Sequence, residues 1–101
     1  MLILIPLDGA DEKSSKITTV MNVKKWALVN FDAGETQSVA FFDDRTQTGA
    51  DWIDFVVLEN KFENYLDFME EGMMVLVRRE EETVEEIIEA FKFKELDEAG
   101  I

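Results

Sequence analysis

The stretch Met1-Leu-Ile-Leu-Ile-Pro-Leu-Asp-Gly9 decides the fold. Its first five residues are continuously apolar, as is typical of a strand that is covered on both faces in the middle of a sheet. Pro6 and the pair Asp8-Gly9 end the run. The run is shorter than an export signal and lacks its basic residues. We predict a central strand, and Asp8-Gly9 is then either a plain turn or a ligand-binding loop, because open α/β sheets bind ligands beyond the carboxyl ends of their strands.

The next part of the chain predicts a hairpin and a further strand. Two β-rich runs, residues 26–31 and 37–42, flank a turn that contains Gly34. After a polar segment, residues 52–58 form another apolar run of strand length. We expect this run to be a buried strand.

The second half predicts helix, strand and helix. Phe62, Leu66 and Met69 fall at helical intervals, which indicates a helix of about nine residues that ends near Gly72. Residues 73–77 predict a strand, and together with residues 52–58 they predict a right-handed parallel crossover. A last helix begins at Thr83, which forms a capping-box pattern with Glu86.

Composition excludes several classes of function. The 101 residues include 10 basic and 23 acidic side chains, no His and no Cys, for a formal net charge of −13. Such a chain has no Ser-His or Cys-His nucleophile and no His/Cys zinc site. Its charge disfavours nucleic acid and membrane surfaces as partners. We expect a single domain over residues 1–101, located in the cytoplasm because the absence of Cys fits a reducing compartment.

Carboxylates and thioethers are the remaining metal ligands. A metal-dependent nuclease would gather acids at strand ends, and the residues available for this are Asp8, Asp32, Asp51 and Asp54. No basic groove accompanies them, so this function is disfavoured. The thioethers available to contact a metal cluster belong to Met21, Met69, Met73 and Met74. Core packing is the favoured role for the last three.

The charge is concentrated in the second half of the chain, at −11 against −2 for residues 1–50. Glu85, Glu86 and Glu89 lie on the last helix, where a solvated acidic face is the simplest interpretation. If this face is recognised, we expect a protein partner with a basic surface and binding that weakens with salt. A homodimer is a further expectation, through the hairpin edge or an apolar patch around Trp26, Phe41 and Phe42.

Residues 2–9 and 25–34 resemble the opening strand and the second strand with its turn in the dinitrogenase iron–molybdenum cofactor biosynthesis family. Residues 37–42, 52–58, 72–77 and 82–91 are similar to its later strands and final helix. The resemblance implies a ribonuclease-H-like α/β fold, with a five-stranded mixed sheet of a hairpin plus parallel strands and two to three helices. It also implies a role in binding or carrying iron–sulfur or iron–molybdenum clusters rather than catalysis.

One segment departs from the family's pattern. The family's Ser-Pro-His-Phe-Gly-Arg segment corresponds to residues 18–23, where Val20 stands at the His position and Val23 at the Arg position. The family's first crossover helix is also missing, since few residues separate Phe42 from Trp52. The tentative cofactor-binding loop therefore consists of Asp8, Gly9, Thr18, Thr19, Met21 and Asn22.

The leading hypothesis is a small acidic non-enzymatic protein that acts by protein contact, with cluster binding degenerate or lost. The alternatives are a cluster carrier that uses the tentative loop and, less favoured, the carboxylate nuclease.

Overall fold

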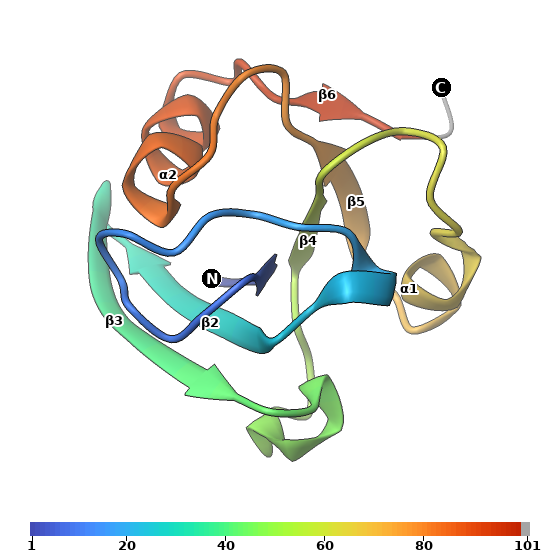
Figure 1. The fold of residues 1–101 in the computed structure, drawn as a ribbon. Helices are drawn as coiled ribbons and strands as arrows, with labels where there is room; N and C mark the ends of the chain where they lie inside the picture. The colour runs from blue at the N-terminus through green and yellow to red at the C-terminus, as the bar shows by residue number, and fades with distance from the viewer. Residues whose placement is uncertain (100–101) are drawn as a thin grey trace.

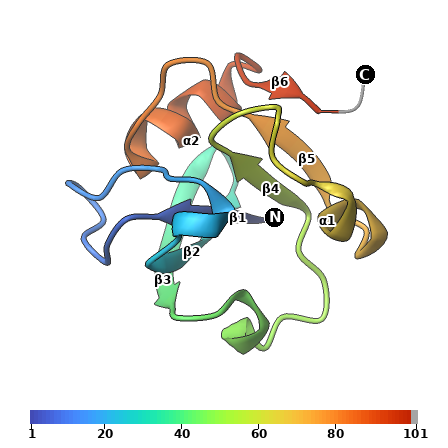
Figure 2. The same cartoon turned by 45° about the vertical axis from the view of Figure 1, so that its right-hand side comes forward.

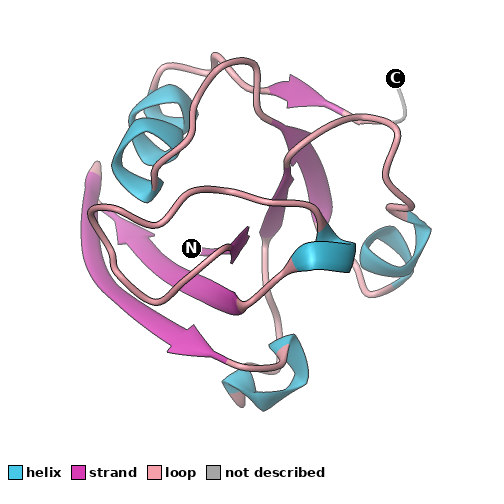
Figure 3. Cartoon of the chain, viewed as in Figure 1, coloured by secondary structure: helices cyan, strands magenta, loops and turns pink. Residues whose placement is uncertain are grey.

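The computed structural model describes residues 1–99, which form a mixed α/β domain around one six-stranded sheet (Figures 1 and 3). The strands are β1 (Leu2–Leu7), β2 (Lys25–Asp32), β3 (Glu35–Phe42), β4 (Phe55–Leu58), β5 (Met74–Val77) and β6 (Asp97–Glu98). The α-helices are α1 (Leu66–Glu70) and α2 (Val84–Lys92), and the 3-10 helices are η1 (Val20–Asn22) and η2 (Arg45–Thr48).

The prediction of a central first strand is confirmed. The strand order is β3-β2-β1-β4-β5-β6, so β1 lies in the interior of the sheet. It pairs antiparallel with β2 and parallel with β4, and β4 pairs parallel with β5. Because β1, β4 and β5 run in the same direction, their carboxyl ends meet at one edge of the sheet. The prediction of a parallel pair across residues 52–77 is confirmed as well.

One helix covers each face of the sheet, and β4 and β5 lie between the two helices in Figures 1 and 2. Alternate side chains of β1 point to opposite faces. Ile3 and Ile5 belong to the core that contains Ile87 of α2, whereas Leu4 belongs to the core that contains Phe68 of α1. Ile87 is fully buried, which stabilises the fold by about 2 kcal/mol. The capping-box prediction for α2 is confirmed, since Thr83 and Glu86 exchange the expected hydrogen bonds.

Two predictions about the sheet are corrected. The strand count is six rather than five, because the two-residue strand β6 adds an antiparallel edge next to β5. Strand β4 begins at Phe55 instead of residue 52. The Trp52 side chain is 59% exposed and lies over Gly72, so it does not occupy a strand position.

The prediction for α1 was wrong in length and in the face it buries. The helix has five residues rather than about nine, and Phe68 is its buried side chain. Phe62 is 86% exposed and Leu66 59% exposed, so the predicted apolar stripe points away from the core. Met69 is also exposed. Gly72 has the positive φ that the sequence suggested, at 90°.

Core packing was predicted for three methionines and holds only for Met73, which is buried. Met74 is exposed, as is Met69. Trp26, one residue of the apolar patch expected for dimerisation, is only 4% exposed and packs against Phe68 in the core, whereas Phe41 and Phe42 are partly exposed. No helix within residues 1–99 is both long and apolar enough to cross a membrane.

Arg45 fastens the connection between β3 and β4 to α1. Its guanidinium donates two hydrogen bonds to the Glu71 carboxylate, at 2.8 and 2.7 Å, and lies 4.6 Å from the centre of the Phe68 ring. The hydrogen bonds from Arg45 lower the pKa of Glu71. The 3-10 helix η2 is the helical segment between β3 and β4, as expected from the few residues that separate Phe42 from Trp52.

Replacing Arg45 with Lys is expected to lower the free energy of unfolding by about 1 kcal/mol, because an ammonium cannot reproduce the paired hydrogen bonds and the planar contact with Phe68. The stabilisation that Glu71 provides is present above the pKa of Glu71 in the unfolded state. It is lost as the pH falls through the lowered pKa of Glu71 in the folded state. Urea unfolding of both proteins at neutral and strongly acidic pH measures this. A difference between the two proteins that stayed constant over the whole range would contradict the role of Glu71.

Candidate functional site

The candidate site lies at the carboxyl ends of β1, β4 and β5, where three connecting segments meet. The segment after β1 pairs with the start of α2, since the Ile17 amide donates to the Glu82 carbonyl at 2.7 Å. The same segment contacts the one after β4 through Val20, whose amide donates to the Glu63 carboxylate at 2.7 Å. Residues far apart in the sequence therefore form one surface.

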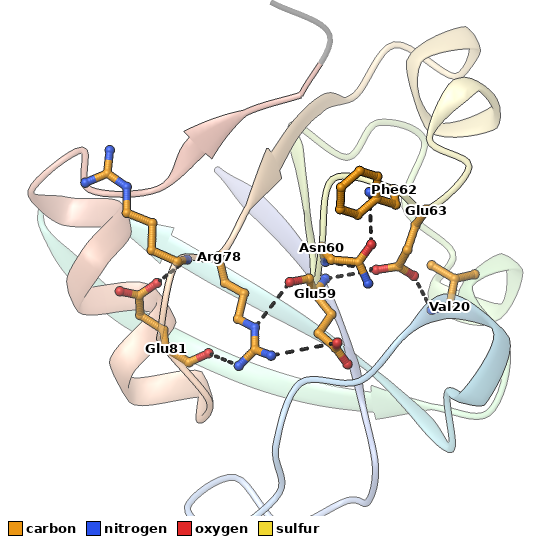
Figure 4. Close-up of polar contacts among 8 residues, drawn as sticks. Val20, Glu59, Asn60, Phe62, Glu63, Arg78 and Glu81 are labelled. Atoms are coloured by element: carbon orange, nitrogen blue, oxygen red, sulfur yellow. Dashed lines mark hydrogen bonds and ion pairs between the residues drawn. The ribbon is translucent and has the colours of Figure 1, made fainter.

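Glu63 organises this surface (Figure 4). One carboxylate oxygen accepts from Val20, and the other accepts from the amides of Glu59 and Asn60 at 3.1 and 3.2 Å. The Asn60 side chain in turn accepts from the Phe62 amide at 2.9 Å. A single carboxylate thus satisfies three backbone donors and holds η1 against the turn that follows β4.

Arg78 joins the residues that follow β4 to the segment between β5 and α2 (Figure 4). Its Nε donates to the Glu59 carbonyl at 3.2 Å, and its Nη1 donates to the Glu81 carbonyl at 3.0 Å. The Glu59 carboxylate lies 3.8 Å from the guanidinium. Arg79 pairs with Asp97 at 3.0 Å. Both arginines therefore neutralise carboxylates of the acidic second half of the chain.

Asp8 and Gly9 form the base of a closed loop. The Asp8 carboxylate accepts from the Lys16 amide at 2.8 Å, and a Cβ added at Gly9 would lie 2.9 Å from the Ser15 hydroxyl. Within this loop, hydrogen bonds from the Lys13 and Ser14 amides lower the pKa of Asp11. The Asp8 side chain therefore serves loop closure.

The remaining residues of the tentative loop point in different directions. The Thr18 amide donates to the Pro6 carbonyl, and the Thr19 hydroxyl is buried with no hydrogen-bond partner within residues 1–99. Met21 is 95% exposed, and Asn22 is exposed beside it. Over the described part of the chain, no group of three or more Asp or Glu side chains is placed to hold a metal ion.

The four acids considered for a nuclease are not brought together. Asp8 follows β1 at the carboxyl edge, whereas Asp54 precedes β4 at the opposite edge and accepts from the Leu2 amide at 2.8 Å. Asp32 is exposed and is the last residue of β2, close to where β2 pairs with the start of β1. A two-metal site requires ligands within a few ångströms of one another, so this arrangement does not supply one.

Three acids of α2, Glu85, Glu86 and Glu89, line one shallow hollow together with Glu81 before the helix and Glu95 after it. Glu86 is engaged in the capping box, and hydrogen bonds from the Thr83 and Glu82 amides lower its pKa. Glu85 and Glu89 are exposed and have no ion-pair partner within the described chain. Their carboxylates are therefore available to a partner.

An apolar group of side chains is exposed next to Glu63. It consists of Met21 on η1, of Phe62 in the turn before α1 and of Leu66 and Met69 on α1, and we call it the apolar edge. The hydrogen bond between Val20 and Glu63 holds the two segments side by side. Clustered exposed apolar side chains are uncommon on proteins that have no partner.

Solved structures resemble this chain over nearly its whole length. One is a crystal structure of a candidate dinitrogenase from Methanocaldococcus jannaschii, with a TM-score of 0.73 and 20% identity over 99% of this chain and 95% of that one. Another is an NMR structure of a candidate NifB protein from Thermotoga, of the DUF35 family, with a TM-score of 0.71 and 22% identity over 96% and 91%. These likenesses establish the fold. No family model matches the sequence, and no curated protein matches it significantly.

Sequence reasoning missed Glu63 and the apolar edge. The spacing of Asn60 and Glu63 is that of a capping box and was a usable signal, because Glu63 accepts from the Asn60 amide as such a residue would. Phe62 and Leu66 gave a helical stripe, and a stripe alone does not say whether it faces the core or a partner.

Proposed function

We propose that this chain is a small non-enzymatic protein related to metallocofactor biosynthesis proteins, and that it acts by contact with another protein. The observation that carries the proposal is the apolar edge, with Phe62 86% exposed and Met21 95% exposed beside a rigidly held turn. Aromatic and Met side chains are enriched in protein interfaces. Two structural neighbours, a candidate dinitrogenase and a candidate NifB protein, supply the link to metallocofactors.

A partner with a basic surface fits the charge around this edge. The acids Asp67 and Glu70 alternate with the apolar residues of α1, and both are exposed. The exposed carboxylates of α2, Glu85 and Glu89, add a field that attracts a basic partner from a distance. We infer that the apolar edge makes the contact and that the acidic residues accelerate association.

Donor chemistry argues against direct ligation of iron. The loop of residues 18–22 offers hydroxyls, an amide and one thioether, whereas iron–sulfur clusters are held by thiolates or imidazoles. Anaerobic incubation with iron and sulfide, or with molybdate, followed by elemental analysis should leave the monomer free of stoichiometric metal. Retention of one cluster per chain would replace our proposal with a cluster carrier.

The order and direction of the strands support a more specific fold than a mixed α/β sheet. We propose a ribonuclease-H-like arrangement, supported by the order β3-β2-β1-β4-β5 with β2 antiparallel to its neighbours. In such a sheet the carboxyl edge of the parallel strands is the expected binding region. The apolar edge borders that region.

Capture from an extract of the source cells tests the proposal. We expect the immobilised chain to retain a basic protein and the Phe62→Ser variant to lose it, because Phe62 is the aromatic side chain of the apolar edge and is 86% exposed. The matched control is Phe93→Ser, which removes another exposed Phe outside this edge. Equal retention by the chain and by Phe62→Ser would overturn the proposal.

The charge of α2 is tested separately. Glu85→Gln/Glu89→Gln is expected to slow association with the captured protein and to reduce its dependence on salt. Asp51→Asn/Glu98→Gln changes the net charge equally but alters exposed acids outside α2, so it serves as the control. Equal slowing by both variants would assign the effect to total charge instead of α2.

A further inference from the structure

A second site lies at the edge of the sheet where β4 and β5 begin. There the amino ends of β4 and β5, the end of β2 and the residues that follow α2 line a half-open cavity of about 620 Å³. Its apolar lining comes from Phe31, Phe55, Met74, Leu76, Phe91 and Leu96. This volume lies within the range of sites that bind small molecules.

Three aromatic rings give the cavity a fixed wall. Phe91 of α2 contacts Phe55 at 4.9 Å and Phe31 at 5.5 Å between ring centres, with interplanar angles of 77° and 82°. Such edge-to-face contacts hold rings in defined orientations. All three rings pack against the core beneath α2. An apolar ligand would therefore meet a wall that is already formed.

The rim of the cavity is basic, in contrast to the protein as a whole. Lys92 and Lys94 line it, and within residues 1–99 neither has an ion-pair partner within 4.0 Å. Glu98 is the one acidic residue of the described chain among those that line it. Two lysines on one rim stand out in a chain with a net charge of −13, and the Lys92 ammonium lies 5.9 Å from the centre of the exposed Phe93 ring.

Lys94 adopts a backbone conformation that favours glycine. Its φ is 57°, and it follows α2 in a Schellman motif, where its amide donates to the Phe91 carbonyl and the Glu95 amide donates to the Ala90 carbonyl. A cation near a helix C-terminus gains from the helix dipole, but that gain does not require this strained position. An unfavourable φ at Lys94, next to a cavity, indicates that the lysine side chain has a function there.

We propose that this cavity binds a small monocarboxylate with an apolar tail. The tail would contact the wall formed by Phe31, Phe55 and Phe91, and the carboxylate would lie at the rim near Lys92 and Lys94. Charge complementarity selects an anion here, although the net charge of the protein favours cations everywhere else. The inference is independent of the proposed protein partner, because the cavity and the apolar edge share no residues.

Calorimetric titration with three ten-carbon probes tests the charge selection. Decanoate, decanol and decyltrimethylammonium carry the same tail with negative, neutral and positive ends. We expect decanoate to bind most tightly and to shift the NMR signal of the Met74 methyl group. Binding of the cation as tightly as decanoate, or an unchanged Met74 signal, would overturn the proposal.

Lysine variants test whether Lys92 and Lys94 bind the carboxylate of the ligand. Lys92→Gln/Lys94→Gln should weaken decanoate binding by about tenfold and leave decanol unaffected. Lys24→Gln/Lys61→Gln makes the same change in net charge at exposed positions outside the cavity, and should leave decanoate binding almost unchanged. Lys94→Gly should raise the Tm and still weaken decanoate. Equal losses with both lysine pairs would contradict the site.

Discussion

Replacing Glu63 with Ala is expected to lower the free energy of unfolding by about 3 kcal/mol, because three backbone donors lose their acceptor at once. The amides of Val20, Glu59 and Asn60 all donate to this carboxylate. Those of Glu59 and Asn60 belong to the turn after β4, whereas Val20 belongs to η1, 43 residues earlier. The substitution therefore weakens the turn itself and its contact with η1.

Urea unfolding and amide hydrogen exchange measure the two effects. Exchange at Val20 should accelerate more than exchange in β1, since the contact with η1 is lost before the sheet opens. Glu63→Gln keeps one acceptor oxygen and should fall between the native protein and Glu63→Ala. Glu70→Ala is the control, because Glu70 is exposed on the neighbouring helix. Equal destabilisation by Glu70→Ala would contradict the role assigned to Glu63.

Replacing Gly72 with Ala is expected to lower the free energy of unfolding by about 2 kcal/mol, for two separable reasons. The φ of 90° is unfavourable for any residue with a Cβ. A Cβ at this position would also lie 2.6 Å from Cη2 of Trp52, so the indole would have to move.

Gly34→Ala separates the two causes. Gly34 has a φ of 79° and no atom within 4 Å of an added Cβ, so this variant carries only the backbone penalty, about 1 kcal/mol. Gly72→Ala alone should change the fluorescence of the exposed Trp52. If Gly34→Ala lost as much stability as Gly72→Ala and the fluorescence of both matched the native protein, the contact with Trp52 would have no energetic role.

Local sequence patterns correctly predicted the elements that are stabilised by residues close together in the sequence. The apolar run of β1, the hairpin around Gly34 and the capping box of Thr83 each depend on neighbouring residues, and the structure has all three. The strand β6 was missed because its residues, Asp97 and Glu98, have no strand-like pattern. They pair only because β5 offers an open edge.

The candidate site was harder to predict because it depends on distant contacts. The predicted helix does not begin at Phe62, because the Glu63 carboxylate accepts hydrogen bonds from the Glu59 and Asn60 amides. These hydrogen bonds favour a turn over a helix at this point. Phe62 is then released to the surface. The cavity beneath α2 joins Phe31 to Phe91 across 60 residues, and no spacing in the sequence signals that contact.

Hydrogen exchange of the captured complex tests the central claim, that the apolar edge is the surface that contacts another protein. With the captured partner bound, the amides of residues 20–22 and 61–70 should exchange more slowly, while those on β3 and the far side of α2 stay unchanged. Slowing confined to α2 or β3, with residues 61–70 unaffected, would contradict the claim.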